Sequence, residues 1–219
     1  MCVLMASDGD KISLDWVQKA QKNNKDGMGM AWIENDQVAF EKSISEDRVM
    51  ELMNAIDGPF LLHFRMASIG DVSPELCHPF PINAEASLEL KGTAPSVMAH
   101  NGHWGKWKDF CVQRLLAGGV TFPEGDFSDT RAMAWLAYHC GENVLSLIDE
   151  KVVTLTPTGL KIYGGGWTLK DGVWLSNQSF LIDYLPGASG VGTYQNGWKD
   201  EDWDGYGNWQ KENAKIGYH

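Results

Sequence analysis

The sequence predicts a layered α+β domain, because strand patterns and helix patterns are mixed along it without strict alternation. The first part carries a hairpin and two amphipathic helices, the middle carries two more helices, and three strands separated by Pro or Gly turns follow. Such mixing favours an α+β fold over a doubly wound parallel sheet. A chain of 219 residues can bury one sizeable core, so we expect one domain over residues 1–186.

The first strand and the first helix are predicted from their apolar patterns. Residues 2–6 form a short apolar segment, typical of a buried strand, and a Gly-containing turn follows it. Leu14, Val17 and Ala20 recur at helical spacing after Ser13, a residue type favoured at helix N-caps. The chain is therefore expected to begin with a strand and an amphipathic helix.

Turn residues and apolar stripes define the other elements of the first half. Asn35-Asp36 between two apolar segments is typical of a hairpin turn, and Gly58-Pro59 is expected to end a helix. We expect a hairpin over 28–42, a helix with the stripe Val49, Leu52, Met53 and Ile56, and strands at 60–65 and 97–100.

The second half is predicted to hold two helices and then three strands, before the composition changes. The helices are expected at 107–117 and 128–139, and the strands at 152–155, 159–163 and 172–176. Residues 187–219 are rich in Gly, Asn, Asp and Trp and lack a sustained period. We expect them to form an extension that packs on the domain or docks a partner through its aromatic residues.

Charge and hydropathy exclude several classes of function. The formal net charge is −11, and nucleic-acid binding requires clustered Lys and Arg. No apolar segment approaches the roughly 18 residues needed to cross a bilayer, and the N-terminus lacks a basic segment followed by an apolar one. We therefore expect a cytoplasmic protein with neither a nucleic-acid nor a membrane partner; the oligomeric state stays open.

The four cysteines, Cys2, Cys77, Cys111 and Cys140, are too sparse and irregular for a disulfide framework. A zinc site built from the pairs Cys77-His78 and His139-Cys140 is an alternative, but the paired CxxC spacing typical of such sites is missing. No metal site and no cofactor is expected.

Cys2 combines two chemical groups if an aminopeptidase removes Met1. Its thiol can act as a nucleophile, and its free α-amine, which titrates near neutrality, can take the thiol proton. The alternative is that Cys2 is simply a small apolar residue at the start of a buried strand.

Four further motifs lie along the chain in a fixed order after Met1-Cys2-Val3-Leu4. They are Lys25-Asp26-Gly27-Met28-Gly29, then His63-Phe64-Arg65 with His78-Pro79-Phe80, then Ala99-His100-Asn101-Gly102, and finally Ser128-Asp129-Thr130. In this order they resemble the class II glutamine amidotransferases, most closely the small standalone members, over about the first 180 residues. The resemblance thus covers the domain expected at 1–186.

The resemblance implies a fold and a reaction. The fold is that of the N-terminal nucleophile hydrolases, a four-layer αββα sandwich of two antiparallel sheets between helices. In the reaction, the thiol of Cys2 attacks the side-chain amide of glutamine, ammonia leaves, and water hydrolyses a γ-glutamyl thioester. Neither a metal nor a cofactor is implied.

The resemblance also implies roles for individual residues. Asn101 and Gly102 would form the oxyanion hole. Arg65 would bind the α-carboxylate of glutamine and Asp129 its α-ammonium group, with the hydroxyl of Ser68 nearby. Each has an ordinary structural alternative: a hairpin turn at Asn101-Gly102, a surface charge at Arg65, and a helix N-terminal residue at Asp129.

Three functions stay open at this point. In the first, ammonia from glutamine passes to a separate acceptor enzyme. In the second, the domain hydrolyses a γ-glutamyl amide of a small metabolite. In the third, the fold is catalytically silent and serves as a binding or assembly module. Because the terminal amine already serves as base, no histidine is assigned base chemistry, and the histidines are expected to be structural or peripheral.

Overall fold

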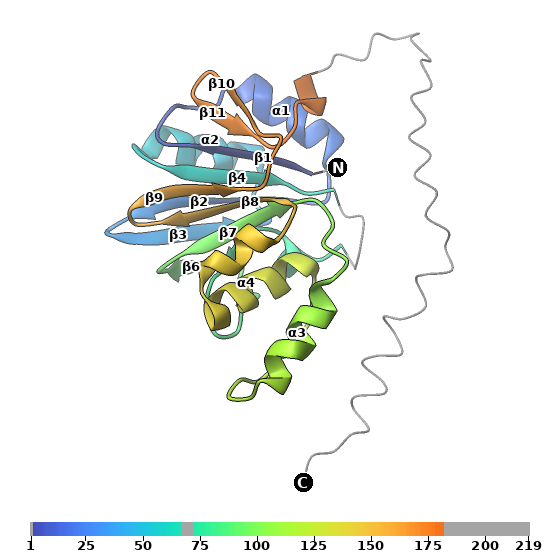
Figure 1. Ribbon diagram of the computed structural model, residues 1–219. Coiled ribbons are helices and arrows are strands. Elements are labelled where there is room, and N and C mark those ends of the chain that lie inside the picture. The colour runs from blue at the N-terminus through green and yellow to red at the C-terminus, as the bar shows by residue number, and fades with distance from the viewer. Residues whose placement is uncertain (1, 67–71, 182–219) are drawn as a thin grey trace, which may run out of the picture. The chain divides into compact units, whose positions relative to one another are not determined.

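The computed structural model describes residues 2–66 and 72–181, which form an α+β domain of two antiparallel sheets and flanking helices (Figure 1). The expected extension at 187–219, the domain boundary at 186, Met1 and Ser68 lie outside these residues. None of the helices among the described residues combines the length and the apolar character that a bilayer span requires.

Seven strands of the described chain form the larger sheet, in the order β10-β11-β1-β4-β2-β3-β6, and every neighbouring pair is antiparallel. The first strand lies between β11 and β4, which places the N-terminus inside the sheet rather than at its edge. The strands are β1 (Val3–Ser7), β2 (Met28–Glu34), β3 (Gln37–Lys42), β4 (Phe60–Phe64), β6 (Lys91–Ala94), β10 (Thr168–Lys170) and β11 (Val173–Leu175).

Within the same described ranges, four strands form the smaller antiparallel sheet, in the order β5-β7-β8-β9. They are β5 (Phe80–Pro81), β7 (Val97–Asn101), β8 (Lys151–Thr156) and β9 (Gly159–Tyr163). The core between the two sheets is formed by alternate residues, such as Leu4 and Ala6 of β1, Ala99 of β7 and Val153 of β8. These sheets are therefore packed face to face.

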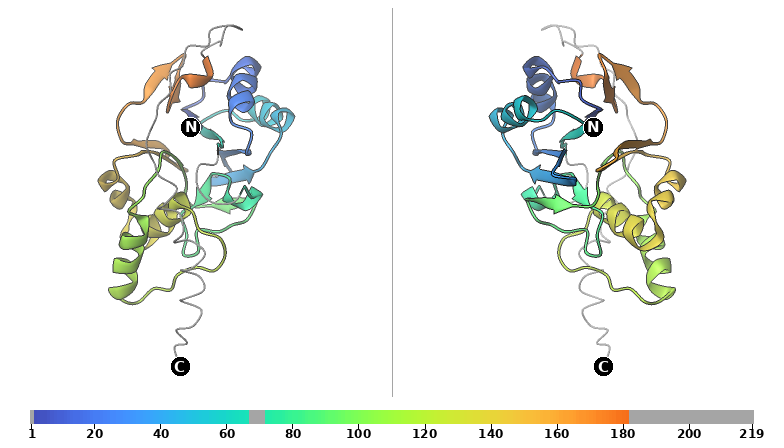
Figure 2. Two further views of the ribbon diagram at one scale, coloured as in Figure 1. Left: turned by 90° about the vertical axis from the view of Figure 1, so that its right-hand side faces the viewer. Right: turned by 90° about the vertical axis from the view of Figure 1, so that its left-hand side faces the viewer.

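Helices cover the outer faces of both sheets. Figure 2 shows α1 and α2 on one side of the sheets and α3 and α4 on the other. A second core lies between α1, α2 and the larger sheet, where Val17 and Met53 of the helices pack among strand residues. The helices are α1 (Leu14–Asn23), α2 (Glu46–Ala55), α3 (Trp107–Leu116) and α4 (Asp129–Cys140), with short 3₁₀ turns η1 (Pro74–Leu76), η2 (Glu142–Leu147) and η3 (Ser179–Leu181).

The two faces of the larger sheet belong to different cores. Met5 of β1 and Leu62 of β4 are paired neighbours, and both join the core beneath the helices. Leu4 and Leu61, each one residue earlier, join the core between the sheets. Successive side chains of a strand point to opposite faces, so a residue's place along β1 decides which core it enters.

Local signals place most elements where the sequence predicts them. Ser13 caps α1 by accepting a hydrogen bond from the Trp16 N–H at 3.3 Å, and Ser128 caps α4 through Arg131 N–H at 3.1 Å. Asn35 and Asp36 both have positive φ, as a tight hairpin turn between β2 and β3 requires.

Some details differ from the sequence-based expectations. Helix α2 ends at Ala55, before Gly58-Pro59, because Ile56 has already adopted an extended conformation. Leu14, expected on the buried stripe of α1, is 46% exposed because it lies in the first turn of that helix. The short strands β5, β6 and β10 were not predicted, since they depend on pairing with distant strands.

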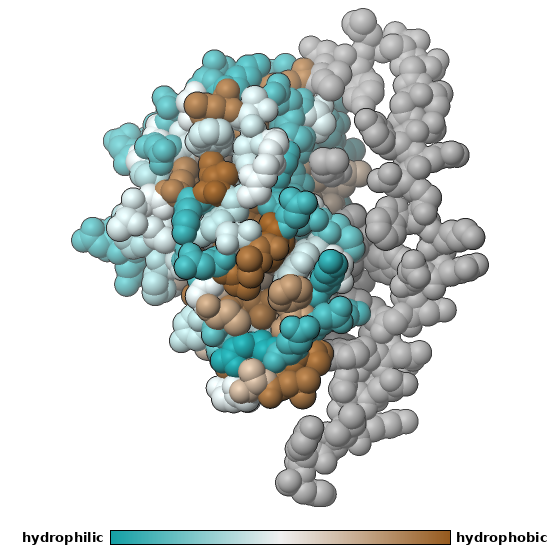
Figure 3. Space-filling view, in the orientation of Figure 1, coloured by the Kyte–Doolittle hydropathy of each residue, from teal (hydrophilic) through white to brown (hydrophobic). Residues whose placement is uncertain are grey.

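Apolar side chains on the face shown in Figure 3 lie in several patches separated by hydrophilic ones. Leu116 of α3 and Leu147 of η2 are the most exposed large apolar residues of the described chain, at 82% and 75%. Isolated apolar residues of this kind are normal on protein surfaces.

Candidate active site

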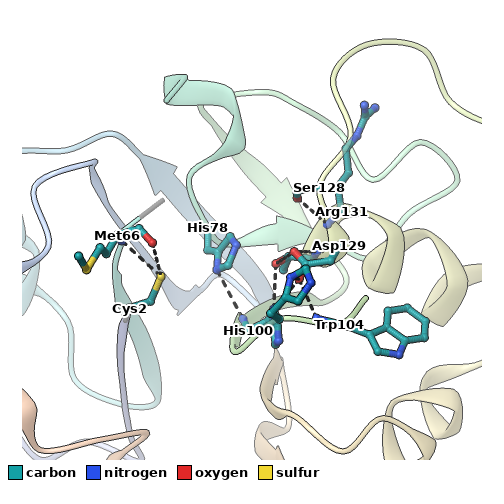
Figure 4. A network of polar contacts seen from close by, with 10 residues as sticks. Cys2, Met66, His78, His100, Trp104, Ser128, Asp129 and Arg131 are labelled. Atoms are coloured by element: carbon teal, nitrogen blue, oxygen red, sulfur yellow. Dashed lines mark hydrogen bonds and ion pairs between the residues drawn. The ribbon is translucent and has the colours of Figure 1, made fainter. Parts of the chain in front are cut away.

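Cys2 lies directly before β1, and its thiol is held by the backbone of Met66 (Figure 4). The Met66 N–H donates to Cys2 Sγ at 3.3 Å, and Sγ lies 3.4 Å from the Met66 carbonyl oxygen, to which it donates. Burial raises the pKa of the Cys2 thiol, and the Met66 hydrogen bond and the Arg65 charge offset this only in part. The thiol is therefore protonated at neutral pH and needs a base before it can attack.

Arg65 follows β4 and is 6% exposed. Its backbone N–H donates to Gly27 O at 2.8 Å, and its carbonyl accepts from the Asp26 N–H at 3.1 Å, so two of the predicted motifs are adjacent. Its Nη1 donates to the Ser73 carbonyl at 3.0 Å. Arg65 lines the same cavity as Cys2, and its guanidinium group is held in place rather than being a mobile surface charge.

Asn101 ends β7, and Gly102 starts the loop that leads to α3. The dipeptide is therefore not the turn of a hairpin. The Asn101 Nδ2 group donates to Cys2 O at 2.9 Å and to Ser176 Oγ at 2.7 Å. Gly102 allows a close approach, because a Cβ at this position would overlap the carboxyl group of Glu150.

Asp129 is the first residue of α4, and its carboxylate is fixed by backbone donors (Figure 4). Oδ2 accepts from the Trp104 N–H at 3.0 Å, and Oδ1 accepts from the Thr130 N–H at 2.8 Å. The Nδ1 atoms of His100 and His103 lie 3.9 and 3.8 Å from Oδ2. The N-terminus of α4 and these contacts together stabilise the Asp129 carboxylate in the wall of the cavity.

One small cavity, of about 50 Å³, brings most of the predicted residues together. Cys2, Arg65, Gly102 and Asp129 line it, and Asn101 adjoins it through its bond to Cys2. Ser68 lies outside the described residues, so its predicted role stays a prediction.

Two polar side chains near Cys2, those of Ser176 and Asn177, are not predicted from the sequence. Both residues follow β11, and Asn177 Nδ2 donates to Cys2 O at 2.7 Å. The only sequence signal is that Ser176 ends the strand predicted at 172–176 and Asn177 follows it, and the loops after strands often carry functional side chains.

The histidines of the motifs lie closer to the site than the sequence predicts, because His78 and His100 line the cavity. The ring of His63 packs against that of His78, with centroids 4.0 Å apart, and His100 Nδ1 lies 3.1 Å from Thr130 Oγ1. Burial lowers the pKa of all three imidazoles, that of His63 to about 3. They therefore form an uncharged wall at neutral pH.

Over residues 2–66 and 72–181 no group of three or more His, Cys, Asp or Glu side chains is arranged to hold a metal ion. The alternative zinc site at Cys77-His78 and His139-Cys140 accordingly has no support among these residues.

No family model matches the sequence, and no curated protein matches it significantly. Solved structures do match. One is the glutamine phosphoribosylpyrophosphate amidotransferase from B. subtilis complexed with ADP and GMP, with a TM-score of 0.53 and 14% identity, covering 80% of this chain and 41% of that chain. Another, described as the allosteric regulatory enzyme of purine biosynthesis, has a TM-score of 0.55 and 15% identity, with the same coverage of 80% and 41%.

The chain thus spans less than half the length of the solved structures it matches. At these identities the likeness concerns the fold, and it agrees with the two antiparallel sheets and flanking helices described above. The resemblance that the ordered motifs predict is confirmed at this level: the chain has the fold of the class II glutamine amidotransferases, which are N-terminal nucleophile hydrolases.

Proposed function

We propose that this domain releases ammonia from glutamine through a γ-glutamyl thioester on Cys2, once Met1 has been removed. The observation that carries the proposal is that Cys2, Arg65, Gly102 and Asp129 line one cavity. These residues are far apart in the sequence and belong to different elements, so their convergence is a property of the fold.

The proposed reaction uses the amine and the thiol of Cys2 in turn. The amine takes the thiol proton as Sγ attacks the amide carbon, and it returns the proton to the departing nitrogen as the C–N bond breaks. Water then attacks the thioester carbon and gives a proton to the amine, which passes it to the sulfur as the C–S bond breaks. Glutamate and ammonia are the products. The raised pKa of the thiol supports the need for such a base.

Charge complementarity supports glutamine as the substrate. The Arg65 guanidinium can bind the α-carboxylate, and Asp129 can accept hydrogen bonds from the α-ammonium group. The Gly102 N–H and the Asn101 amide are the proposed donors to the oxyanion. The neutral imidazoles of His78 and His100 add no charge to the cavity wall that would compete with these two.

We further propose that the ammonia passes to a separate acceptor enzyme and that the chain works in the cytoplasm. One structural neighbour is a glutamine phosphoribosylpyrophosphate amidotransferase, which supports ammonia transfer. All four cysteines are free, which fits a reducing compartment.

Intact mass and glutamate release test the proposal. We expect the native protein to lack Met1 and to gain a single adduct on Cys2 from 6-diazo-5-oxo-norleucine. Cys2→Ala should lower glutamate release by more than about a hundredfold, whereas Cys140→Ala, at an exposed cysteine, should leave it unchanged.

Each alternative function predicts a different outcome. Turnover of a γ-glutamyl amide without turnover of glutamine would identify a hydrolase of a metabolite conjugate. Retention of Met1 together with an unreactive Cys2 would identify a binding or assembly module. Unchanged glutamate release in Cys2→Ala would refute the mechanism.

A further inference from the structure

The carbonyl oxygen of Cys2 accepts hydrogen bonds from two side-chain amides. Asn101 Nδ2 donates to it at 2.9 Å and Asn177 Nδ2 at 2.7 Å. A carbonyl oxygen has two lone pairs, so both of its acceptor positions are occupied. The residue that carries the nucleophile is therefore held from two sides, by the end of β7 and by the segment after β11.

The Asn177 side chain is oriented for this contact. Its Oδ1 accepts from the Ser179 N–H at 3.1 Å and from Ser179 Oγ at 2.6 Å. With the oxygen engaged in this way, the amide nitrogen faces Cys2 O. The backbone beside it is also fixed, because the Ser176 N–H donates to Leu4 O at 2.9 Å and Lys151 Nζ donates to Ser176 O.

Asn101, in contrast, has two competing tasks. Its Nδ2 group has two hydrogens, and these go to Cys2 O and to Ser176 Oγ. Donation to an oxyanion requires one of them. Ser176 Oγ also accepts from the Leu4 N–H at 2.9 Å and so keeps a donor when Asn101 turns away. Cys2 O keeps its donor through Asn177.

We propose that Asn177 is a positioning residue, which holds the Cys2 carbonyl throughout the reaction and so frees the Asn101 amide for the oxyanion. The inference rests on the proposed function, since it assumes that Cys2 is the nucleophile. After removal of Met1, Cys2 is the terminal residue, and terminal residues fray unless they are tied down. The contacts of its thiol with Met66, at 3.3 and 3.4 Å, are those of a weak sulfur donor and acceptor.

The test compares Asn177→Ala and Asn177→Asp with Gln178→Ala, an exposed neighbour, in protein shown by intact mass to lack Met1. Asn177→Asp is isosteric and replaces the donor by an acceptor, so it removes the contact with the least change in shape. We expect both Asn177 variants to lower kcat for glutamate release by about tenfold to a hundredfold, with KM changed by less than about threefold. Gln178→Ala should match the wild type, and thermal unfolding identifies variants that fail to fold.

A second measurement separates this inference from the proposed function. In Asn177→Ala, a loosened Cys2 should react at least about threefold faster with iodoacetamide and more slowly with 6-diazo-5-oxo-norleucine. If the wild type releases no glutamate, the proposed function fails, and the iodoacetamide rates still test the positioning. A kcat within about twofold of the wild type, or an unchanged iodoacetamide rate in folded Asn177→Ala, overturns the inference.

Discussion

Gly102→Ala is the most direct test of how the proposed oxyanion donor is packed. A Cβ built on Gly102 would lie 2.7 Å from Glu150 Cδ and 3.0 Å from His100 Nε2, and it would overlap Glu150 Oε2. Ordinary carbon contacts are about 3.5–4.0 Å, so the carboxyl group or the loop must move by about 1 Å. If the loop moves, the Gly102 N–H leaves the oxyanion position, and a loss of about a hundredfold in kcat is expected.

The double variant Gly102→Ala/Glu150→Ala separates the overlap from other effects of the added methyl group. The carboxyl group of Glu150 accepts a hydrogen bond from the His103 backbone, which partly offsets the rise in its pKa caused by burial. Glu150→Ala alone therefore removes one backbone contact. We expect that single change to lower kcat by less than about tenfold. The double variant should then recover most of the activity lost in Gly102→Ala.

The assay is steady-state glutamate release, with kcat and KM determined for the wild type and the three variants. The tight contact with His100 remains in the double variant, so recovery should be incomplete. A double variant no more active than Gly102→Ala would refute the reasoning, because the Glu150 carboxyl would then not be the obstacle. Thermal unfolding of each variant is the control for loss of fold.

Three further predictions concern binding, capping and pH. Arg65→Lys should raise KM for glutamine by about tenfold to a hundredfold with little change in kcat, because a single ammonium replaces a two-pronged donor; a change in kcat alone would argue against carboxylate binding. Ser13→Ala should lower the free energy of unfolding by about 1 kcal/mol in urea titrations, since it removes the cap on Trp16 N–H, and no change would contradict that role. Burial lowers the pKa of His63 to about 3 from 6.5, so the folded state binds fewer protons between these values. The free energy of unfolding should therefore fall as the pH drops from 6.5 toward 3, by up to about 1.4 kcal/mol per pH unit from this group; His63→Phe should reduce that slope in urea titrations, and an identical slope would disprove the assignment.

Elements with local signals were predictable from the sequence, whereas elements made by distant pairing were not. The hairpin of β2 and β3 is encoded by Asn35-Asp36, and α1 and α4 are encoded by caps and apolar spacing. Strand β6, by contrast, exists because it pairs with β3, which lies about fifty residues earlier in the chain. No propensity within residues 91–94 specifies that partner.

The candidate site likewise combines residues that local motifs predict with contacts that depend on distant strand pairing. The identities of Cys2, Arg65, Gly102 and Asp129 follow from short motifs, and the fold brings them to one cavity. The contact of Asn177 with Cys2, 175 residues apart in the chain, could not be predicted, because it depends on the pairing of β11 with β1. The cluster of His63, His78 and His100 likewise depends on which strands lie side by side, and the sequence alone does not specify those neighbours.

The period of two along each strand explains why the site lies where the core between the sheets ends. Leu4 and Ala6 of β1 face the second sheet, so Cys2, two residues before Leu4, continues on the same side. In β7 the same alternation leads from Ala99 to Asn101. Cys2 and the neighbouring amide of Asn101 are thus the polar continuation of an apolar core.

Because of this placement, the register of β1 determines which way the Cys2 thiol points. Insertion of one residue between Cys2 and Val3 would keep the pairing of β1 with β4 and β11 but would turn the thiol toward the helix-covered face. The amide of Asn101 would then face a different residue, although the four motifs that follow Met1-Cys2-Val3-Leu4 would be unchanged. The motifs therefore specify the chemistry only together with the pairing of β1 with β4 and β11, in which Val3 and Leu4 lie opposite Phe64 and His63.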